Sequence, residues 1–178
     1  MRRRLALASI LCCALGVHAQ PAPEDPFAPI RFFGGDWRGT ASGEPGAVGA
    51  VERSYAFVLE GHFLHERNTT TYAPHEKNPQ GEVHEHWSFF SYDRARKRIL
   101  LRQFHEESFV NIYVLAPESA AQKLVFVSED FENFDDAWRA RETYELRSAD
   151  ELVETFELAP PGKEFAVYSR SELKRVAR

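Results

Sequence analysis

The feature of this sequence that most constrains its fold is a series of short alternating segments that fills the chain after Phe32. Apolar and polar residues alternate within each segment, and this period of two is typical of β-strands. Turn residues separate the segments, and no amphipathic helix interrupts them. The predicted strands are residues 36–42, 49–60, 62–72, 83–92, 97–106, 108–116, 122–130, 137–147, 151–158 and 164–176. Ten short strands at this spacing predict an all-β sandwich or barrel.

The two faces of the predicted strands distinguish these architectures. In the fourth strand, His84, His86 and Phe90 share one face, while Glu85 and Trp87 share the other. Neither face is purely apolar or purely polar. A sandwich core would give a cleaner alternation, whereas a barrel that encloses a ligand or ordered water tolerates polar residues inside. We therefore predict a single antiparallel up-and-down β-barrel of about ten strands.

The N-terminus predicts export. Three arginines precede an apolar run from Leu5 to about Val17, and the small side chain of Ala19 suits cleavage by signal peptidase. A spanning helix needs roughly 20 apolar residues, so a signal peptide is favoured over a membrane anchor. We predict a signal peptide at 1–19, an extended proline-rich leader at 20–31 and a barrel domain at 32–178. The mature protein would be secreted or periplasmic, with no membrane attachment.

Composition excludes several function classes. Both cysteines, Cys12 and Cys13, lie in the predicted signal peptide, so the mature chain would have no disulfide, no thiol nucleophile and no thiolate metal ligand. The formal net charge is −5, and it becomes three units more negative when the signal arginines are removed. An acidic chain of this kind is not expected to bind nucleic acid or anionic membranes.

Histidines form the most evident cluster of chemically versatile residues. Apart from His18, every histidine falls between His62 and His105. His84 and His86 point the same way on one strand and would supply two metal ligands, with His105 on the next strand as a third. A zinc or iron site needs about three or four such ligands. Histidine is also a common half-buried strand residue, and we expect no metal site here.

No other motif indicates catalysis. The chain has no nucleophile elbow, no phosphate-binding glycine loop and no HExxH helix. Carboxylates and arginines are abundant, and they include Glu142, Glu154 and Arg141. Paired carboxylates could act as acid and base if they are buried, but we interpret most residues of this set as the solvated face of the sheet. An enzymatic role is therefore open but not favoured.

The segment GGDWRGTASG (34–43) resembles the first strand of lipocalin-like barrels. The resemblance implies that Trp37 lies across the closed end of the barrel, that Gly39 is structural, and that a basic residue near the C-terminus stacks on the Trp37 ring. Lys174 and Arg175, in the closing LKRV, are the candidates for this contact.

A second resemblance covers nearly all of residues 32–176. HEHWSFFSYD, the block 139–158 and GKEFAVYSRSELKR together resemble the nitrobindin-like haem-binding barrels and a related group of exported lipocalin-like domains with no assigned function. In the family a histidine on the last strand holds the haem iron. Tyr168 occupies that position here. Tyrosinate is able to ligate ferric haem, but the departure argues against inherited haem binding, and no cofactor is expected.

These observations predict a binding protein whose lumen takes a small hydrophobic or amphipathic molecule. The expected polar contacts are Tyr168, Arg170, His84, His86 and His105. An inward-facing Arg170 would favour an anionic end group, such as that of a fatty acid. The alternatives are a small barrel enzyme that uses the lumenal histidines with or without a metal, a haem-binding barrel with Tyr168 as the ligand, and a barrel filled by its own side chains. The long loop 73–82 is either a lid or a solvated connector.

Overall fold

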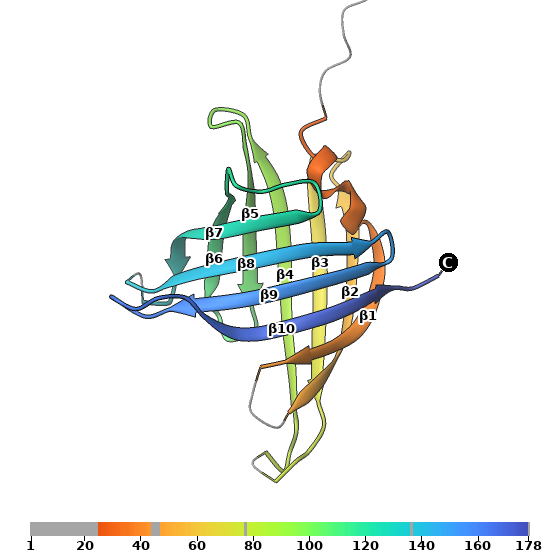
Figure 1. Cartoon of the computed structure of the whole chain (residues 1–178), viewed down its shortest axis with the longest axis vertical. Coiled ribbons are helices and arrows are strands. Elements are labelled where there is room, and N and C mark those ends of the chain that lie inside the picture. The colour runs from red at the N-terminus through yellow and green to blue at the C-terminus, as the bar shows by residue number, and fades with distance from the viewer. Residues whose placement is uncertain (1–24, 44–46, 77, 136, 178) are drawn as a thin grey trace, which may run out of the picture.

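The chain forms one closed antiparallel β-barrel of ten strands (Figure 1). The computed structural model describes residues 25–43, 47–76, 78–135 and 137–177, so the predicted signal peptide lies outside the described residues. Each strand pairs with the next along the chain, and β10 pairs with β1 to close the barrel. The strands are β1 (Gly35–Ser42), β2 (Val48–Val58), β3 (Phe63–Tyr72), β4 (Glu82–Asp93), β5 (Arg98–His105), β6 (Val110–Leu115), β7 (Lys123–Glu132), β8 (Arg139–Ser148), β9 (Glu151–Ala159) and β10 (Ala166–Arg175).

The architecture confirms the predicted all-β barrel, and all ten predicted strands lie within a few residues of the observed ones. Inward-facing residues alternate with outward-facing ones along each strand, as the pleat requires. Every strand edge is paired, which removes the exposed edges that an open sheet would present.

The predicted extended leader is wrong at its C-terminal end, where Ala28–Phe33 form a short 3₁₀ helix, η1. Pro29 suits the first turn because its φ is already close to helical. Side chains three apart lie on the same side of a 3₁₀ helix, and Phe27, Ile30 and Phe33 are all buried. Because these apolar residues are spaced three apart, the short helix presents one apolar side to the barrel interior.

Trp37 is fully buried inside the end of the barrel that η1 covers. Its indole Nε1 donates a 2.7 Å hydrogen bond to the carbonyl oxygen of Phe33. The guanidinium carbon of Arg175 lies 4.2 Å from the centre of the Trp37 ring system. Arg175 also donates hydrogen bonds to the carbonyl oxygens of Phe32 and Gly34, at 2.7 and 2.6 Å. The predicted basic stack on Trp37 is thus made by Arg175, while Lys174 points outward and pairs with Glu151.

Gly39 is required by the close approach of β1 and β10. A Cβ at this position would lie 1.9 Å from the carbonyl oxygen of Glu172. Any side chain would therefore push apart the two strands that close the barrel, which accounts for the predicted structural role of Gly39.

The interior is layered along the barrel axis. The closed end holds an aromatic and aliphatic plug in which Phe33 stacks on Tyr55 and meets Phe90 and Tyr144. Beyond the plug the inward-facing side chains are mostly polar and buried. They are Arg53, Glu66, Asn68, His86, Ser88, Gln103, Asn111, Glu142, Glu154 and Ser171.

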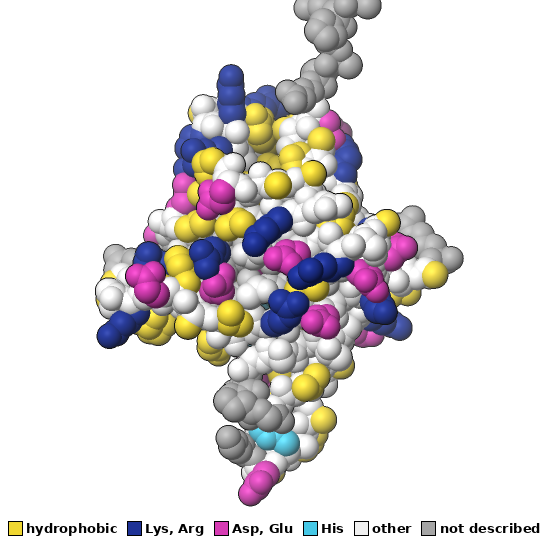
Figure 2. Space-filling model, viewed as in Figure 1, with side chains coloured by type: hydrophobic (Ala, Val, Ile, Leu, Met, Phe, Trp, Pro, Cys, Tyr) yellow, Lys and Arg dark blue, Asp and Glu magenta, His cyan; other side chains and the backbone are white. Residues whose placement is uncertain are grey.

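The outer face carries paired charges. Figure 2 shows basic and acidic side chains interspersed over the face formed by β8, β9 and β10, where Arg141 pairs with Glu157 and Arg170 with Glu172. Among the residues that the structure describes, no helix is long and apolar enough to cross a membrane.

Candidate functional site

A cavity of about 460 Å³ occupies the barrel on the far side of the plug from η1. Its deep part is lined by the buried polar layer, including Arg53, Gln103 and Glu154, which we call the floor. Its outer part is lined by aromatic residues, which we call the mouth: Phe109, Phe131, Phe134, Trp138, Phe156 and Tyr168. Tyr72 and Glu82, the strand pair next to the loop of the β3–β4 hairpin, also line the cavity. The hairpin extends past the other strands (Figure 1), and the two interpretations of loop 73–82, a lid or a solvated connector, stay predictions.

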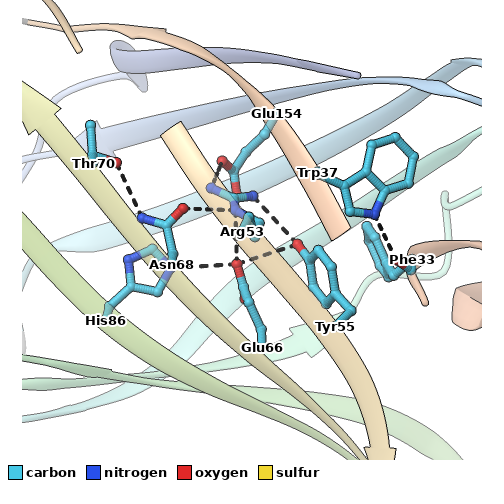
Figure 3. Close-up of polar contacts among 9 residues, drawn as sticks. All are labelled: Phe33, Trp37, Arg53, Tyr55, Glu66, Asn68, Thr70, His86 and Glu154. Carbon is cyan, nitrogen blue, oxygen red and sulfur yellow. Dashed lines mark hydrogen bonds and ion pairs between the residues drawn. The ribbon is translucent and has the colours of Figure 1, made fainter. Parts of the chain in front are cut away.

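Arg53 is at the centre of the floor (Figure 3). Its guanidinium donates to the Glu154 carboxylate at 2.7 Å and to the Asn68 side-chain oxygen at 2.8 Å. It lies 3.1 Å from the Glu66 carboxylate, which also accepts a 3.3 Å hydrogen bond from the Tyr55 hydroxyl. All five side chains are buried, so the floor is a connected network of charges and hydrogen bonds shielded from solvent.

The network keeps its main charges despite burial. Burial by itself would raise the pKa of Glu66, but Arg53, His86 and Ser88 act in the opposite direction and lower that pKa to about 2. Burial would likewise lower the pKa of Arg53, yet Glu154 and Glu66 raise it well above its usual value. Glu66 is therefore an anion and Arg53 a cation at neutral pH.

Glu142 behaves in the opposite way. It has no cation at hydrogen-bond distance among the described residues, and burial raises its pKa well above the usual range, with a further contribution from the negative charge of Glu154. The carboxyl group is thus protonated over a pH range in which an exposed glutamate is ionised. Over that pH range the floor holds a neutral carboxylic acid beside the ion network.

His84, His86 and His105 come together in the cavity wall, as the alternation along β4 predicts. His105 on β5 is paired directly with His86 on β4. One ring nitrogen from each of the three imidazoles lies within 4.8 Å of the other two. Burial, together with the neighbouring His86 and His84, lowers the pKa of His105 to about 3, so the His105 imidazole is neutral at neutral pH.

Tyr168 lies at the mouth and not deep in the lumen. β10 has an irregularity between Val167 and Ser169, and Tyr168 occupies it with 59% of its surface exposed. Its ring meets the edge of Phe156 at 5.7 Å. The residue therefore borders the cavity entrance, and its hydroxyl is not among the floor groups.

The predicted inward orientation of Arg170 is wrong. Its side chain lies on the outer face of the barrel, where the Arg170 Nε is 3.3 Å from the carboxylate of the equally outward Glu172. The inward residues of β10 are Ser169, Ser171 and Leu173, which have the same parity as Arg175. Because Arg175 stacks on the buried Trp37, the alternation of the strand turns Arg170 to solvent.

The floor network is not predicted from the sequence. The sequence places Glu142 and Glu154 in a set of charged residues of which most are expected on the solvated face, and it indicates no particular role for Arg53 and Glu66. A signal for them was present, because Arg53 alternates with the apolar Val51 and Tyr55 on the inward face of β2. A charged residue that shares its parity with core residues points inward whatever its polarity.

Comparison with known proteins identifies the fold alone. No protein-family model matches the chain, and no curated protein matches it. The crystal structure of the Rv2717c protein from M. tuberculosis is similar, with a TM-score of 0.65 at 15% sequence identity. The similarity covers 86% of this chain and 99% of that protein.

Proposed function

We propose that this protein is an exported, lipocalin-like barrel that binds one small amphipathic molecule in its cavity, with the apolar part at the mouth and the polar part at the floor. The observation that carries the proposal is the division of one cavity of about 460 Å³ into an aromatic mouth and a polar floor. Ligand sites in proteins are concave and largely apolar, with a few converging polar groups, and often have volumes of about 300–1,000 Å³.

The floor favours a neutral or cationic end group over an anionic one. Arg53 is the one arginine or lysine among the described lining residues, and Glu66 and Glu154 both interact with it. An entering carboxylate would meet two acidic groups for one basic group in a site of low dielectric constant. Arg170, which would have favoured a fatty acid from inside the lumen, lies on the outer face. Long-chain alcohols, amines and amides are the better candidates.

The residues present do not fit a haem held from the last strand. Tyr168, at the position of the iron ligand in the nitrobindin-like barrels, lies at an exposed irregularity of β10 with its ring against Phe156. The imidazoles that face the cavity come from β4 and β5 instead. An organic ligand without haem iron is therefore the function that this geometry supports best.

The experiment is a fluorescence titration with the neutral probe N-phenyl-1-naphthylamine, in the presence of a chelator. We expect saturable binding of one probe per chain, with a blue-shifted emission as the naphthyl ring leaves water. Decanol and decylamine should then displace the probe, and decanoate should do so at least tenfold less effectively. The three competitors have the same ten-carbon chain, so a difference between them reports how the floor receives the end group. A lack of saturable binding, or equal displacement by all three competitors, would contradict the proposal.

Paired substitutions on β10 locate the binding site. Ser171 faces the cavity and Glu172 faces solvent, so Ser171→Phe fills the cavity while Glu172→Phe adds the same ring outside. We expect Ser171→Phe to weaken probe binding at least tenfold and Glu172→Phe to leave it unchanged. Ser169→Phe, nearer the mouth, gives a second test if Ser171→Phe does not fold. Equal affinity in all of these variants would place the probe elsewhere.

A further inference from the structure

Three imidazoles in the cavity wall have an arrangement that binding of an organic molecule does not explain. The centres of the His84, His86 and His105 rings are separated by 6.0, 5.7 and 5.4 Å, which makes a nearly equilateral triangle. We propose that His84, His86 and His105 bind a divalent transition-metal ion of the zinc type, with a further coordination position open to the cavity. This metal site does not depend on the proposed organic molecule, since all three imidazoles belong to the chain itself.

The distances suit a metal site that closes slightly on binding. Zinc–imidazole bonds of about 2.0–2.1 Å in a tetrahedral arrangement place ligand nitrogens roughly 3.4 Å apart. One nitrogen from each ring already lies within 4.8 Å of the other two. Side-chain rotations that move each nitrogen by about 1 Å therefore complete the triad. The strand pairing of His86 with His105 fixes the backbone positions, so no rearrangement of the sheet is needed.

Each imidazole also has a polar neighbour that would hold it in place. His84 Nδ1 is 2.9 Å from the Glu107 carboxylate, and His86 Nε2 is 3.5 Å from that of Glu66. The side-chain amide of Asn111 lies 3.3 Å from His105 Nε2. Histidines that bind metals characteristically interact through the second ring nitrogen with a carboxylate, carbonyl or similar group.

Two further observations favour a cation at this point. The Nδ1 of His105 is buried and has no hydrogen-bond partner among the described residues, which is a cost that metal coordination would remove. In addition, the neighbouring floor has the carboxylates of Glu66 and Glu154 around the single guanidinium of Arg53. The resulting excess of negative charge stabilises an added positive ion.

The open position would face the cavity, because His84, His86 and His105 all line it. Sites with three histidine ligands and one open position are those in which zinc holds a water molecule or a substrate group. The residue types also exclude hard cations such as Mg²⁺ as the preferred occupant, since these bind oxygen ligands. The metal would therefore lie beside the polar end group of an organic molecule bound in the cavity.

The test is a titration of chelator-treated protein with Zn²⁺ by calorimetry and with Co²⁺ by visible absorption. We expect one ion per chain, intense visible bands typical of four-coordinate Co²⁺, and a higher melting temperature with Zn²⁺. His84→Gln, His86→Gln and His105→Gln should each weaken Zn²⁺ binding at least tenfold. Since the His84 side chain is more exposed than that of His86, His84→Gln remains informative if the His86 variant does not fold.

Two matched controls distinguish this site from adventitious binding. His65→Gln removes a histidine that stacks on Phe89 and does not line the cavity, and it should bind Zn²⁺ as the unmodified protein does. Glu106→Gln tests the alternative set formed by His84 with the exposed Glu106 and Glu107, and it should also leave affinity unchanged. The proposal is overturned by absence of stoichiometric binding, by full affinity in His105→Gln, or by a loss in Glu106→Gln as large as that in His105→Gln.

Discussion

At the scale of single residues, Glu142 couples the charge of the floor to the stability of the fold. Its buried carboxyl has a pKa raised well above the usual 4.5, first by burial and then by Glu154. The unfolded chain ionises near 4.5 whereas the folded chain keeps the proton. Stability from this group is therefore fully present below about pH 4.5 and is lost as the pH rises toward the folded pKa. The pH dependence is opposite to that from Glu66, whose pKa is lowered to about 2. Glu66 contributes stability above about pH 4.5 that is lost as the pH falls toward 2.

Glu142→Gln tests this assignment. The amide keeps the shape of the protonated acid but has no proton to lose, so the variant should gain stability over the unmodified protein as the pH rises from about 5 to about 8. The gain should approach about 1.4 kcal/mol per pH unit while the folded carboxyl stays protonated. Urea unfolding at several pH values measures it. Glu151→Gln, at an exposed position on β9, is the control, and parallel stability curves for Glu142→Gln and the unmodified protein would show that Glu142 is ionised in the fold.

At the scale of elements, the closed end joins η1, β1 and β10 through one side chain. Trp37 on β1 donates to the carbonyl of Phe33 in η1 and lies under the guanidinium of Arg175 on β10. Arg175 in turn donates to the carbonyls of Phe32 and Gly34. The indole thus completes the plug and holds together the first and last strands of the barrel.

Trp37→Ala should lower the free energy of unfolding by about 3–5 kcal/mol, because it leaves a cavity in the plug and removes the surface on which Arg175 stacks. Trp87→Ala is the matched control, since Trp87 lies on the outer face with 46% of its surface exposed. We expect that change to cost about 1 kcal/mol or less. Chemical denaturation of both variants measures the difference. A Trp37→Ala protein as stable as the Trp87→Ala protein would show that the closed end does not depend on the indole.

The elements also show how far the sequence alone was informative. Alternation located every strand, and the Gly-bracketed Trp37 with a C-terminal basic residue identified the closed end. The orientation of Arg170 depended on whether Lys174 or Arg175 contacts Trp37, and the sequence left both open. In the structure the contact is made by Arg175, which fixes the parity of β10 and turns Arg170 outward. The irregularity at Tyr168 could not, since nothing in the local residues marks where the strand shifts register. The floor network also required the structure, because Arg53, Glu66 and Glu154 come from β2, β3 and β9 and meet only when the barrel closes.

At the scale of the whole molecule, the barrel separates three environments, and each contains one of the chain's three tryptophans. Trp37 lies in the plug, Trp138 lines the mouth of the cavity, and Trp87 lies on the outer face beside Phe89 and Phe104. The outer aromatic group borders a shallow hollow of its own, so a hydrophobic molecule has two places to bind. We propose that binding occurs in the cavity alone.

The most direct measurement is a ¹H–¹⁵N correlation spectrum of the protein titrated with N-phenyl-1-naphthylamine, in which each tryptophan gives one indole signal. We predict that the Trp138 indole signal and the side-chain amide signals of Gln103 and Asn111 shift as the probe saturates, because these groups line the cavity. The Trp87 signal should stay in place. A saturable shift of Trp87 with no change at Trp138, Gln103 and Asn111 would contradict binding in the cavity.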